Sequence, residues 1–255
     1  MAPLDGKRQL EGTVVVVTGA GRGIGRAVAE SFAADGAAVV CAARSGAEIG
    51  STVHAIQEAG GRALGVPTDI ADIHQVQTMV DTAVSTFGGL DILVANAGAI
   101  HRLAPVAEIP PDEWRRVVDV NLTGTYLCAR AAIEPMRERG GGRIIVIGSG
   151  AGRRSGPHYG PNAAAKAGVS MLVRVLAAEL RASDIAVNEV IPGPVRTAML
   201  DDLLPGGNAP LAADNALGSD WLKDPVDVVP LVRFVAGLPL HGPTGQTYSL
   251  LGRDT

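Results

Sequence analysis

Residues 13–25 read TVVVVTGAGRGIG, and this stretch decides the fold. Thr13 to Thr18 is a continuous run of β-branched residues, which is typical of a strand covered on both faces. Glycines follow at 19, 21, 23 and 25, and an apolar helical pattern begins at Ile24. A strand, a glycine-rich turn and a helix start bring backbone N–H groups and the positive end of a helix dipole toward a phosphate. The stretch predicts a nucleotide-binding βα unit, with a purely structural turn as the alternative.

Strands and helices alternate along the rest of the chain. That order is typical of βαβ units, in which a parallel sheet carries helices on both faces. We predict an α/β fold with a single doubly wound parallel sheet, forming one domain over residues 1–255 without internal repeats. The predicted strands are 37–43, 62–66, 91–95, 143–148, 185–191 and 246–250, and the predicted helices are 24–34, 47–59, 72–87, 112–139 (with an irregularity at Pro135), 161–182 and 224–236.

The segment 199–223 breaks this alternation, because proline, glycine and asparagine are scattered among its leucines. Long irregular insertions in compact domains tend to be lids or binding loops. Since the segment follows the carboxyl end of a strand, we predict a substrate lid at 199–223 rather than a surface excursion.

The composition argues against several classes of function. The chain has 255 residues, 47% of them hydrophobic, and a net charge of −4, so it lacks the basic surface that nucleic-acid binding needs. Its first dozen residues contain no apolar run typical of a signal peptide, and no segment is long enough to cross a membrane. Cys41 and Cys128 lie in apolar segments and indicate reduced core thiols. We expect a cytoplasmic protein that acts on small molecules and has no metal site.

A second stretch, GRRSGPHYGPNAAAK at 152–166, predicts an active site together with Ser149 just before it. Ser149 follows a buried strand, and Pro161 suits the first position of a helix. Asn162 and Lys166 are four residues apart, so both side chains lie on one face of that helix. A serine, an amide and a lysine are thus expected to converge at the carboxyl end of a strand.

Several further motifs follow one another in a characteristic order. TGxxxGIG begins at Thr18, NAG occupies 96–98, and a Pro-Gly pair occupies 192–193. With these motifs the chain resembles, nearly end to end, the short-chain dehydrogenase/reductase family in its β-ketoacyl-reductase-like form. The resemblance implies a Rossmann-type sheet, a nicotinamide cofactor and oxidoreductase activity, with Asn121, Ser149 and Lys166 as catalytic residues. The cofactor contacts that it implies are Gly19, Arg22, Gly23, Ile24, Gly25, Arg44, Ser45, Asp69, Ile70, Asn96, Ala97, Gly98, Lys166, Pro192, Gly193, Val195 and Thr197.

The end of the second predicted strand bears on which nicotinamide cofactor is bound. An acid there binds the ribose 2′-OH of NAD, whereas an arginine accommodates the 2′-phosphate of NADP. The strand ends in Arg44-Ser45 with no acid, and Arg22 in the glycine loop could flank the phosphate. We therefore predict NADP(H) rather than NAD(H), the alternative being that both arginines are ordinary surface charges. Asp69 resembles the family aspartate near the adenine, or else caps a turn as Asp72 is expected to cap a helix.

One catalytic residue of the family pattern is missing. That pattern is Tyr-x-x-x-Lys, in which tyrosine is the general acid and the nearby lysine lowers the pKa of the tyrosine. The position four before Lys166 is Asn162, which also lies 13 positions after Ser149, the family's usual tyrosine spacing. An amide donates and accepts hydrogen bonds but cannot exchange a proton near neutral pH. Loss of a general acid costs about 10²–10⁴ in rate.

Four explanations for Asn162 stay open. Tyr159 or His158 could act as the acid, although both are also expected simply to line a substrate pocket. The chain could be an engineered variant of an active reductase, or its reaction could need no proton here, as in hydride addition to an iminium carbon. Finally, Ser149 and Asn162 could form an oxyanion-type pair for non-redox elimination, isomerisation or cyclisation. We rank an NADP(H)-dependent oxidoreductase of C=O or C=N groups first, a non-redox enzyme second, and a cofactor-binding protein third.

Two predicted helices, 112–139 and 161–182, carry many small residues, and relatives pair these helices in tetramers. We predict a homotetramer with two-fold axes, the alternative being that the alanines only pack against the sheet. The substrate itself is not predicted. Glu189 could face the active site or a subunit contact. The expected pocket residues are His101, Ser149, Gly150, His158, Tyr159, Glu189, Met199 and the segment up to Trp221.

Overall fold

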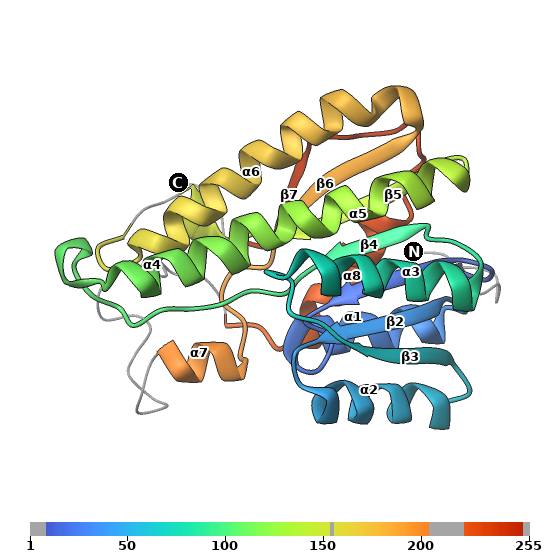
Figure 1. Ribbon diagram of the computed structural model, residues 1–255, viewed down its shortest axis with the longest axis horizontal. Coiled ribbons are helices and arrows are strands. Elements are labelled where there is room, and N and C mark those ends of the chain that lie inside the picture. The colour runs from blue at the N-terminus through green and yellow to red at the C-terminus, as the bar shows by residue number, and fades with distance from the viewer. Residues whose placement is uncertain (1–8, 154–155, 204–221, 252–255) are drawn as a thin grey trace.

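A seven-stranded sheet forms the centre of the computed structural model, which describes residues 9–153, 156–203 and 222–251 (Figure 1). The strand order is β3-β2-β1-β4-β5-β6-β7, and every pair is parallel. This confirms the predicted doubly wound α/β fold. The strands are β1 Val14–Thr18, β2 Ala38–Ala43, β3 Arg62–Pro67, β4 Ile92–Ala95, β5 Gly142–Ile147, β6 Ile185–Ile191 and β7 Thr247–Ser249.

Helices cover both faces of the sheet. Along β1, Val14 and Val16 pack into one buried cluster and Val15 and Val17 into another, because successive strand side chains point to opposite faces. The first cluster holds side chains of α3, α5 and α6, and the second those of α1, α2 and α8. The helices are α1 Gly23–Ala34, α2 Gly46–Glu58, α3 Ile73–Phe87, α4 Pro111–Val118, α5 Gly124–Glu138, α6 Gly160–Leu180, α7 Ala198–Leu203 and α8 Pro225–Ala236.

The order of the strands reverses between β1 and β4. The chain first builds outward from β1 to β2 and β3, then returns to β4 on the other side of β1. In open α/β sheets, ligands bind in the crevice outside the carboxyl ends of the strands at such a switch point. The loops after β1, β4 and β5 therefore meet where a ligand is expected.

The structure corrects one detail of the prediction, the continuity of a helix, whereas the lid stays a prediction. The helix expected over 112–139 is interrupted by a π-helical turn, Asp119–Thr123, whereas α5 runs through Pro135. The π-turn contains Asn121, and such turns occur frequently at functional sites. The predicted lid at 199–223 begins as the short helix α7, which stands apart from the other helices in Figure 1. Residues 204–221, including Trp221, lie outside the described part of the chain.

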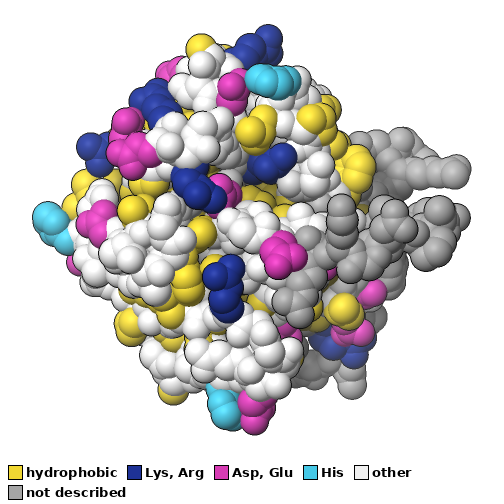
Figure 2. Space-filling model, turned by 90° about the vertical axis from the view of Figure 1, so that its right-hand side faces the viewer, with side chains coloured by type: hydrophobic (Ala, Val, Ile, Leu, Met, Phe, Trp, Pro, Cys, Tyr) yellow, Lys and Arg dark blue, Asp and Glu magenta, His cyan; other side chains and the backbone are white. Residues whose placement is uncertain are grey.

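The surface carries both signs of charge. On the face shown in Figure 2, basic and acidic side chains are interspersed and form no field of one sign. Within the ranges that the structure describes, no helix is long and apolar enough to span a membrane. The same ranges hold no group of three or more His, Cys, Asp or Glu side chains suited to a metal ion.

Candidate active site

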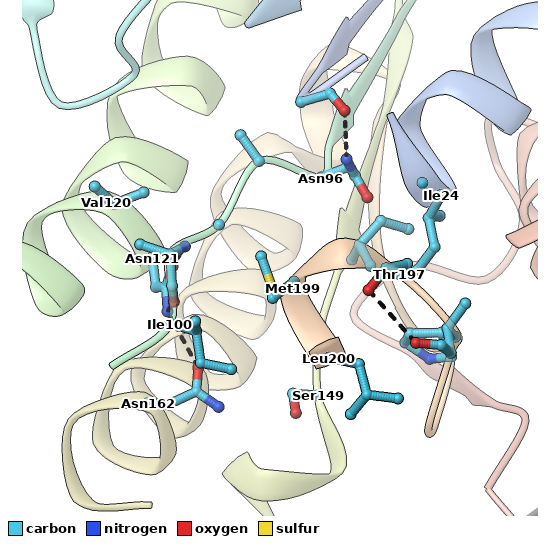
Figure 3. Close-up of a pocket in the computed structure, with 18 of the residues that line it drawn as sticks. Ile24, Asn96, Ile100, Val120, Asn121, Ser149, Asn162, Thr197, Met199 and Leu200 are labelled. Carbon is cyan, nitrogen blue, oxygen red and sulfur yellow. Dashed lines mark hydrogen bonds between the residues drawn. The ribbon is translucent and has the colours of Figure 1, made fainter. Parts of the chain in front are cut away.

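A cavity of about 590 Å³ opens at the carboxyl ends of the strands, at the switch point. It extends from the glycine loop after β1 to the start of α6, as the close-up in Figure 3 shows in part. Four classes of residue predicted from the sequence meet in its wall. These are the glycine-loop residues Gly19, Arg22, Gly23 and Ile24, the segments Arg44–Ser45 and Asp69–Ile70, the motifs Asn96–Gly98 and Pro192–Gly193 with Val195 and Thr197, and the catalytic candidates Asn121, Ser149, Tyr159, Asn162 and Lys166.

The glycines of the loop after β1 let its backbone form part of the cavity wall. Gly19 has a φ of 67°, a left-handed conformation that favours glycine. A Cβ atom on Gly25 would lie 2.2 Å from the carbonyl oxygen of Gly19, so only glycine fits there. Gly25 itself packs beneath the loop and does not line the cavity. The loop thus presents backbone at the N-terminus of α1, the arrangement that binds phosphate.

Asn96 ties this loop to β4. Its Nδ2 atom donates to the carbonyl oxygen of Thr18 at 2.9 Å. The hydroxyl of Thr18 accepts from the backbone N–H groups of Asn96 and Ala97, both at 3.0 Å. These bonds hold the ends of β1 and β4 at a fixed separation across the switch point. This edge of the cavity is therefore held in place by hydrogen bonds within the protein.

Charged side chains line the far end of the cavity, the part beside β2 and α2. Arg44 is exposed at the end of β2, and Ser45 caps α2 by accepting from the backbone N–H of Glu48 at 3.2 Å. Arg22 faces the Glu48 carboxylate at 3.9 Å, and both side chains are exposed, so this pair contributes little to stability.

Asp69 accepts from the N–H of Ala71 at 3.0 Å and so stabilises a turn. The predicted helix cap is confirmed at Asp72, which accepts from His74 and Gln75; these bonds lower the pKa of its carboxyl group.

The π-turn fixes the side chain of Asn121. Its Oδ1 accepts from the N–H of Ala99 at 2.7 Å, and its Nδ2 donates to the carbonyl oxygen of Ala99 at 2.9 Å. An N–H can only donate and a carbonyl can only accept, so these two bonds allow one orientation of the amide. The main-chain oxygen of Asn121 accepts from the hydroxyl of Thr125 at 2.8 Å.

That orientation dictates the orientation of Asn162. The Nδ2 atom of Asn121 also donates to Oδ1 of Asn162 at 3.1 Å, so the Asn162 oxygen must face Asn121. Its amide nitrogen then points into the cavity, on the side where Ser149 lies (Figure 3). The hydroxyl of Ser149 accepts from the N–H of Ala151 at 3.2 Å, which leaves its proton free to donate. The site therefore offers two hydrogen-bond donors, neither of which can release a proton near neutral pH.

Lys166 lies at the cavity floor, with an exposed fraction of 9%. Its ammonium donates to the carbonyl oxygen of Ile147, at the end of β5, at 2.9 Å. Burial lowers the pKa of Lys166 from 10.5 to about 8, against the opposing effect of the negative charge of Glu189. Lys166 can therefore exchange a proton close to neutral pH, which the amide of Asn162 cannot.

Tyr159 lines the cavity as the residue before α6, yet its surroundings differ from those of an activated phenol. Burial raises its pKa, so the hydroxyl is a weaker acid than an exposed tyrosine. Two histidines expected to line the pocket lie outside the cavity lining. His101 is buried and lies outside the cavity, with its Nε2 atom 3.0 Å from the carbonyl oxygen of His158. His158 has a left-handed φ of 75° and also lies outside the cavity lining.

Glu189 occupies neither of the two predicted places. Its side chain is fully buried on β6, outside the cavity lining and away from any surface where a subunit could touch it.

Gly150 and Met199 line the cavity as expected. Sequence reasoning missed Glu48, although the Ser45-x-x-Glu48 spacing of a capping box signals its position. It also missed Ile100, Val120 and Leu251, apolar wall residues that no motif marks, whereas Leu200 falls within the predicted lid segment.

A parallel sheet with a glycine loop, a Ser149–Lys166 pair and one shared cavity defines a nucleotide-dependent α/β enzyme. The protein-family model for short chain dehydrogenases matches residues 13–206 of the chain. The chain therefore belongs to the short-chain dehydrogenase/reductase family, and it is an oxidoreductase of that family.

Individual relatives resemble the chain over most of its length. It is 40% identical to the cis-4-hydroxycyclohexanecarboxylate dehydrogenase of Sinomonas cyclohexanicum, over 88% of each chain. It is 38% identical to 3beta-hydroxysteroid dehydrogenase 1 of Eggerthella lenta, over 96% of this chain and 95% of the relative. Among solved structures, a 7 alpha-hydroxysteroid dehydrogenase complexed with NADH and 7-oxo glycochenodeoxycholic acid superposes with a TM-score of 0.86 at 28% identity, covering 97% and 96% of the two chains.

Proposed function

We propose that the protein is an NADP(H)-dependent reductase of a C=O or C=N group in a small molecule, with Asn162 in the place of the family's tyrosine acid. The observation that carries the proposal is the single cavity that joins the glycine loop to Ser149 and Lys166. The glycine loop supports a phosphate-bearing ligand, since side chains at Gly19 or Gly25 would clash with Asn96 and with the loop's own backbone and so displace the loop. When bound, the nicotinamide supplies the hydride.

The preference for NADP(H) rests on the charges at the far end of the cavity. Arg44 stands at the end of β2 beside Ser45, whose position at the start of α2 adds a helix N-terminus to the site. Arginine with a helix N-terminus suits a phosphate better than a hydroxyl. Glu48 partly neutralises Arg22, so we assign the 2′-phosphate to Arg44 and Ser45.

Proton supply falls to Lys166. The amide of Asn162 and the hydroxyl of Ser149 can orient a carbonyl oxygen by donating to it. Lys166, with a pKa of about 8, can then give up the proton that the reduced oxygen needs. On this assignment reduction slows as the pH rises through 8, because the ammonium is lost.

The apolar part of the wall indicates the kind of substrate. Ile100, Met199 and Leu200 line the cavity near Ser149 and Asn162 in Figure 3, and Leu251 lines it beside Gly150. A substrate therefore needs an apolar body beside one polar group. The named substrates of the relatives include a hydroxycyclohexanecarboxylate and hydroxysteroids. We therefore propose a ring-bearing ketone, its secondary alcohol or the matching imine as the substrate class.

A second candidate follows from the orientation of Asn162. Two donors converge beside Lys166 with no phenol between them, an arrangement that stabilises an enolate or alkoxide without a redox step. Elimination, isomerisation or cyclisation with the cofactor bound and not consumed would use this pair.

An assay panel separates the two candidates. The purified protein is incubated with NADPH and, in turn, cyclic ketones, cyclic imines and β-hydroxy or enolisable ketones, while nicotinamide absorbance and substrate composition are followed together. We expect NADPH to be consumed in step with ketone or imine. Conversion of a substrate with no change in nicotinamide absorbance would instead establish the second candidate.

We also propose a homotetramer. Ala129, Ala132 and Ala165 pack inside the protein, so they do not form an outer contact. However, Tyr126 on α5 and Met171 and Val175 on α6 are 43%, 54% and 44% exposed, which leaves apolar side chains on the outside of these helices. Light scattering should give four times the mass of one chain, and a monomer would refute the proposal.

The two buried, free thiols, Cys41 and Cys128, support a reducing compartment such as the cytoplasm.

A further inference from the structure

Glu189 is a carboxylate shut off from solvent on the central part of β6. Its exposed fraction is 0%, although the ordinary position for glutamate is the surface. Its Oε1 atom accepts from the hydroxyl of Ser170 at 2.7 Å, and Oε2 accepts from the hydroxyl of Thr247 at 2.8 Å. A buried charge is costly unless it is paired as well as hydrogen-bonded. The carboxylate should therefore have cationic neighbours.

Two cations stand near it, on different elements. The guanidinium of Arg153, in the loop after Ser149, lies 3.5 Å from Oε2 and also donates to the Thr247 hydroxyl. Lys166 is on the other side, one helical turn before Ser170 on α6, so that the lysine and the serine share one helix face. Glu189 thus connects α6, β7 and the loop that begins at Ser149.

This carboxylate lies directly against a residue of the cavity wall. Gly148 lines the cavity, and a Cβ atom there would lie 2.2 Å from Oε1 of Glu189. Any other residue at 148 would have to displace the carboxylate. The negative charge therefore lies close to the cavity, in a buried position where water screens it little.

We propose that Glu189 is a positioning residue, which keeps Lys166 as an ammonium directed at Ile147 and, through Arg153, anchors the loop that carries Ser149. Among the described residues, the Glu189 carboxylate on β6 interacts with Arg153 after β5 and with Lys166 on α6, and the titratable Tyr159 stands at the start of α6. The negative charge of Glu189 opposes the lowering of the Lys166 pKa by burial, in agreement with this assignment. The inference rests on the proposed function only in placing Lys166 at the cofactor site.

The sequence allows a direct test, because it contains only three lysines, Lys7, Lys166 and Lys223. Lysine labelled with ¹³C at Cε gives three NMR signals, which Lys7→Arg and Lys223→Arg assign. In the wild type the Lys166 signal should titrate near pH 8. In Glu189→Gln, which keeps the size and the acceptor for Ser170, the midpoint should fall by about one pH unit or more. An unchanged or higher midpoint in folded Glu189→Gln would overturn the proposal.

Ser170→Ala is the matched control, since it removes a hydrogen bond to the carboxylate and leaves the charge. Its Lys166 midpoint should stay close to that of the wild type. A fall as large as in Glu189→Gln would mean that packing, not the charge, sets the state of Lys166, and would also overturn the proposal.

If Glu189→Gln does not fold, Arg153→Gln is the alternative test. The Arg153 side chain is 42% exposed and lies outside the cavity lining, so its replacement should leave the fold intact. Without the competing cation, the carboxylate should hold the Lys166 proton more tightly and raise the midpoint. The amide of Gly152, bonded to the Ser149 carbonyl at 3.1 Å, should exchange faster as the loop loses its anchor. If neither the midpoint nor the exchange rate changes, the inference is wrong.

These titrations use the protein without substrate or cofactor. Their outcome therefore does not depend on turnover. A protein that binds no nicotinamide nucleotide would refute the proposed function while leaving the Lys166 midpoint to be measured as before.

Discussion

Asn162→Tyr is expected to raise the rate of ketone reduction by about 10²–10⁴, the range that a general acid contributes. Asn162 and Lys166 share a face of α6, so a tyrosine at 162 would extend its hydroxyl past the present amide toward Lys166 and Ser149. The ammonium would lower the pKa of the new phenol and ready it as a proton donor. Asn121 would lose one acceptor but would keep both bonds to Ala99.

The matched control is Asn162→Phe, which adds the ring without the hydroxyl. Steady-state kinetics with NADPH and a cyclic ketone should show the gain in kcat for tyrosine only. Equal gains for phenylalanine and tyrosine would mean that the ring acts by filling space. No gain for tyrosine, in a protein that still binds NADPH, would favour the non-redox candidate over a reductase.

Lys166→Met should stabilise the fold at pH 7 and abolish turnover. The methionine removes a buried ammonium whose pKa falls from 10.5 to about 8 on folding, which corresponds to roughly 3 kcal/mol. Loss of the hydrogen bond to Ile147 offsets about 1 kcal/mol of this gain. The variant keeps a similar volume, so the cavity floor should not collapse.

The pH dependence of this gain has a definite sign. Below about pH 8 Lys166 is charged in the folded and the unfolded chain, and the folded wild type bears the full cost. Between about 8 and 10.5 the unfolded chain binds more protons, so the stability of the wild type rises with pH. Urea unfolding at pH 7 and pH 10 should therefore show a larger stabilisation by methionine at pH 7. A difference that grows with pH would contradict a buried ammonium.

The features that the sequence predicts well are those encoded locally. The valine run of β1 predicts a strand buried on both faces, and the spacing of Asn162 and Lys166 predicts their shared helix face. Both follow from residues a few positions apart, for which the periods of strands and helices are sufficient.

The remaining features depend on partners far away in the chain. The orientation of the Asn162 amide follows from Asn121, 41 residues before it, and ultimately from the backbone of Ala99. The role of Glu189 depends on Thr247, 58 residues further on. No local pattern encodes these contacts, so the sequence alone leaves the direction of the donors and the place of the buried carboxylate undecided.

The central claim is that a nicotinamide nucleotide binds across the glycine loop with Lys166 beneath it. Calorimetric titration of the purified protein with NADPH and with NADH tests this claim most directly. We predict saturable binding of one nucleotide per chain, with NADPH the tighter ligand because Arg44 follows β2 with no acid there to bind the ribose 2′-OH of NAD. Failure of both nucleotides to bind would contradict the account.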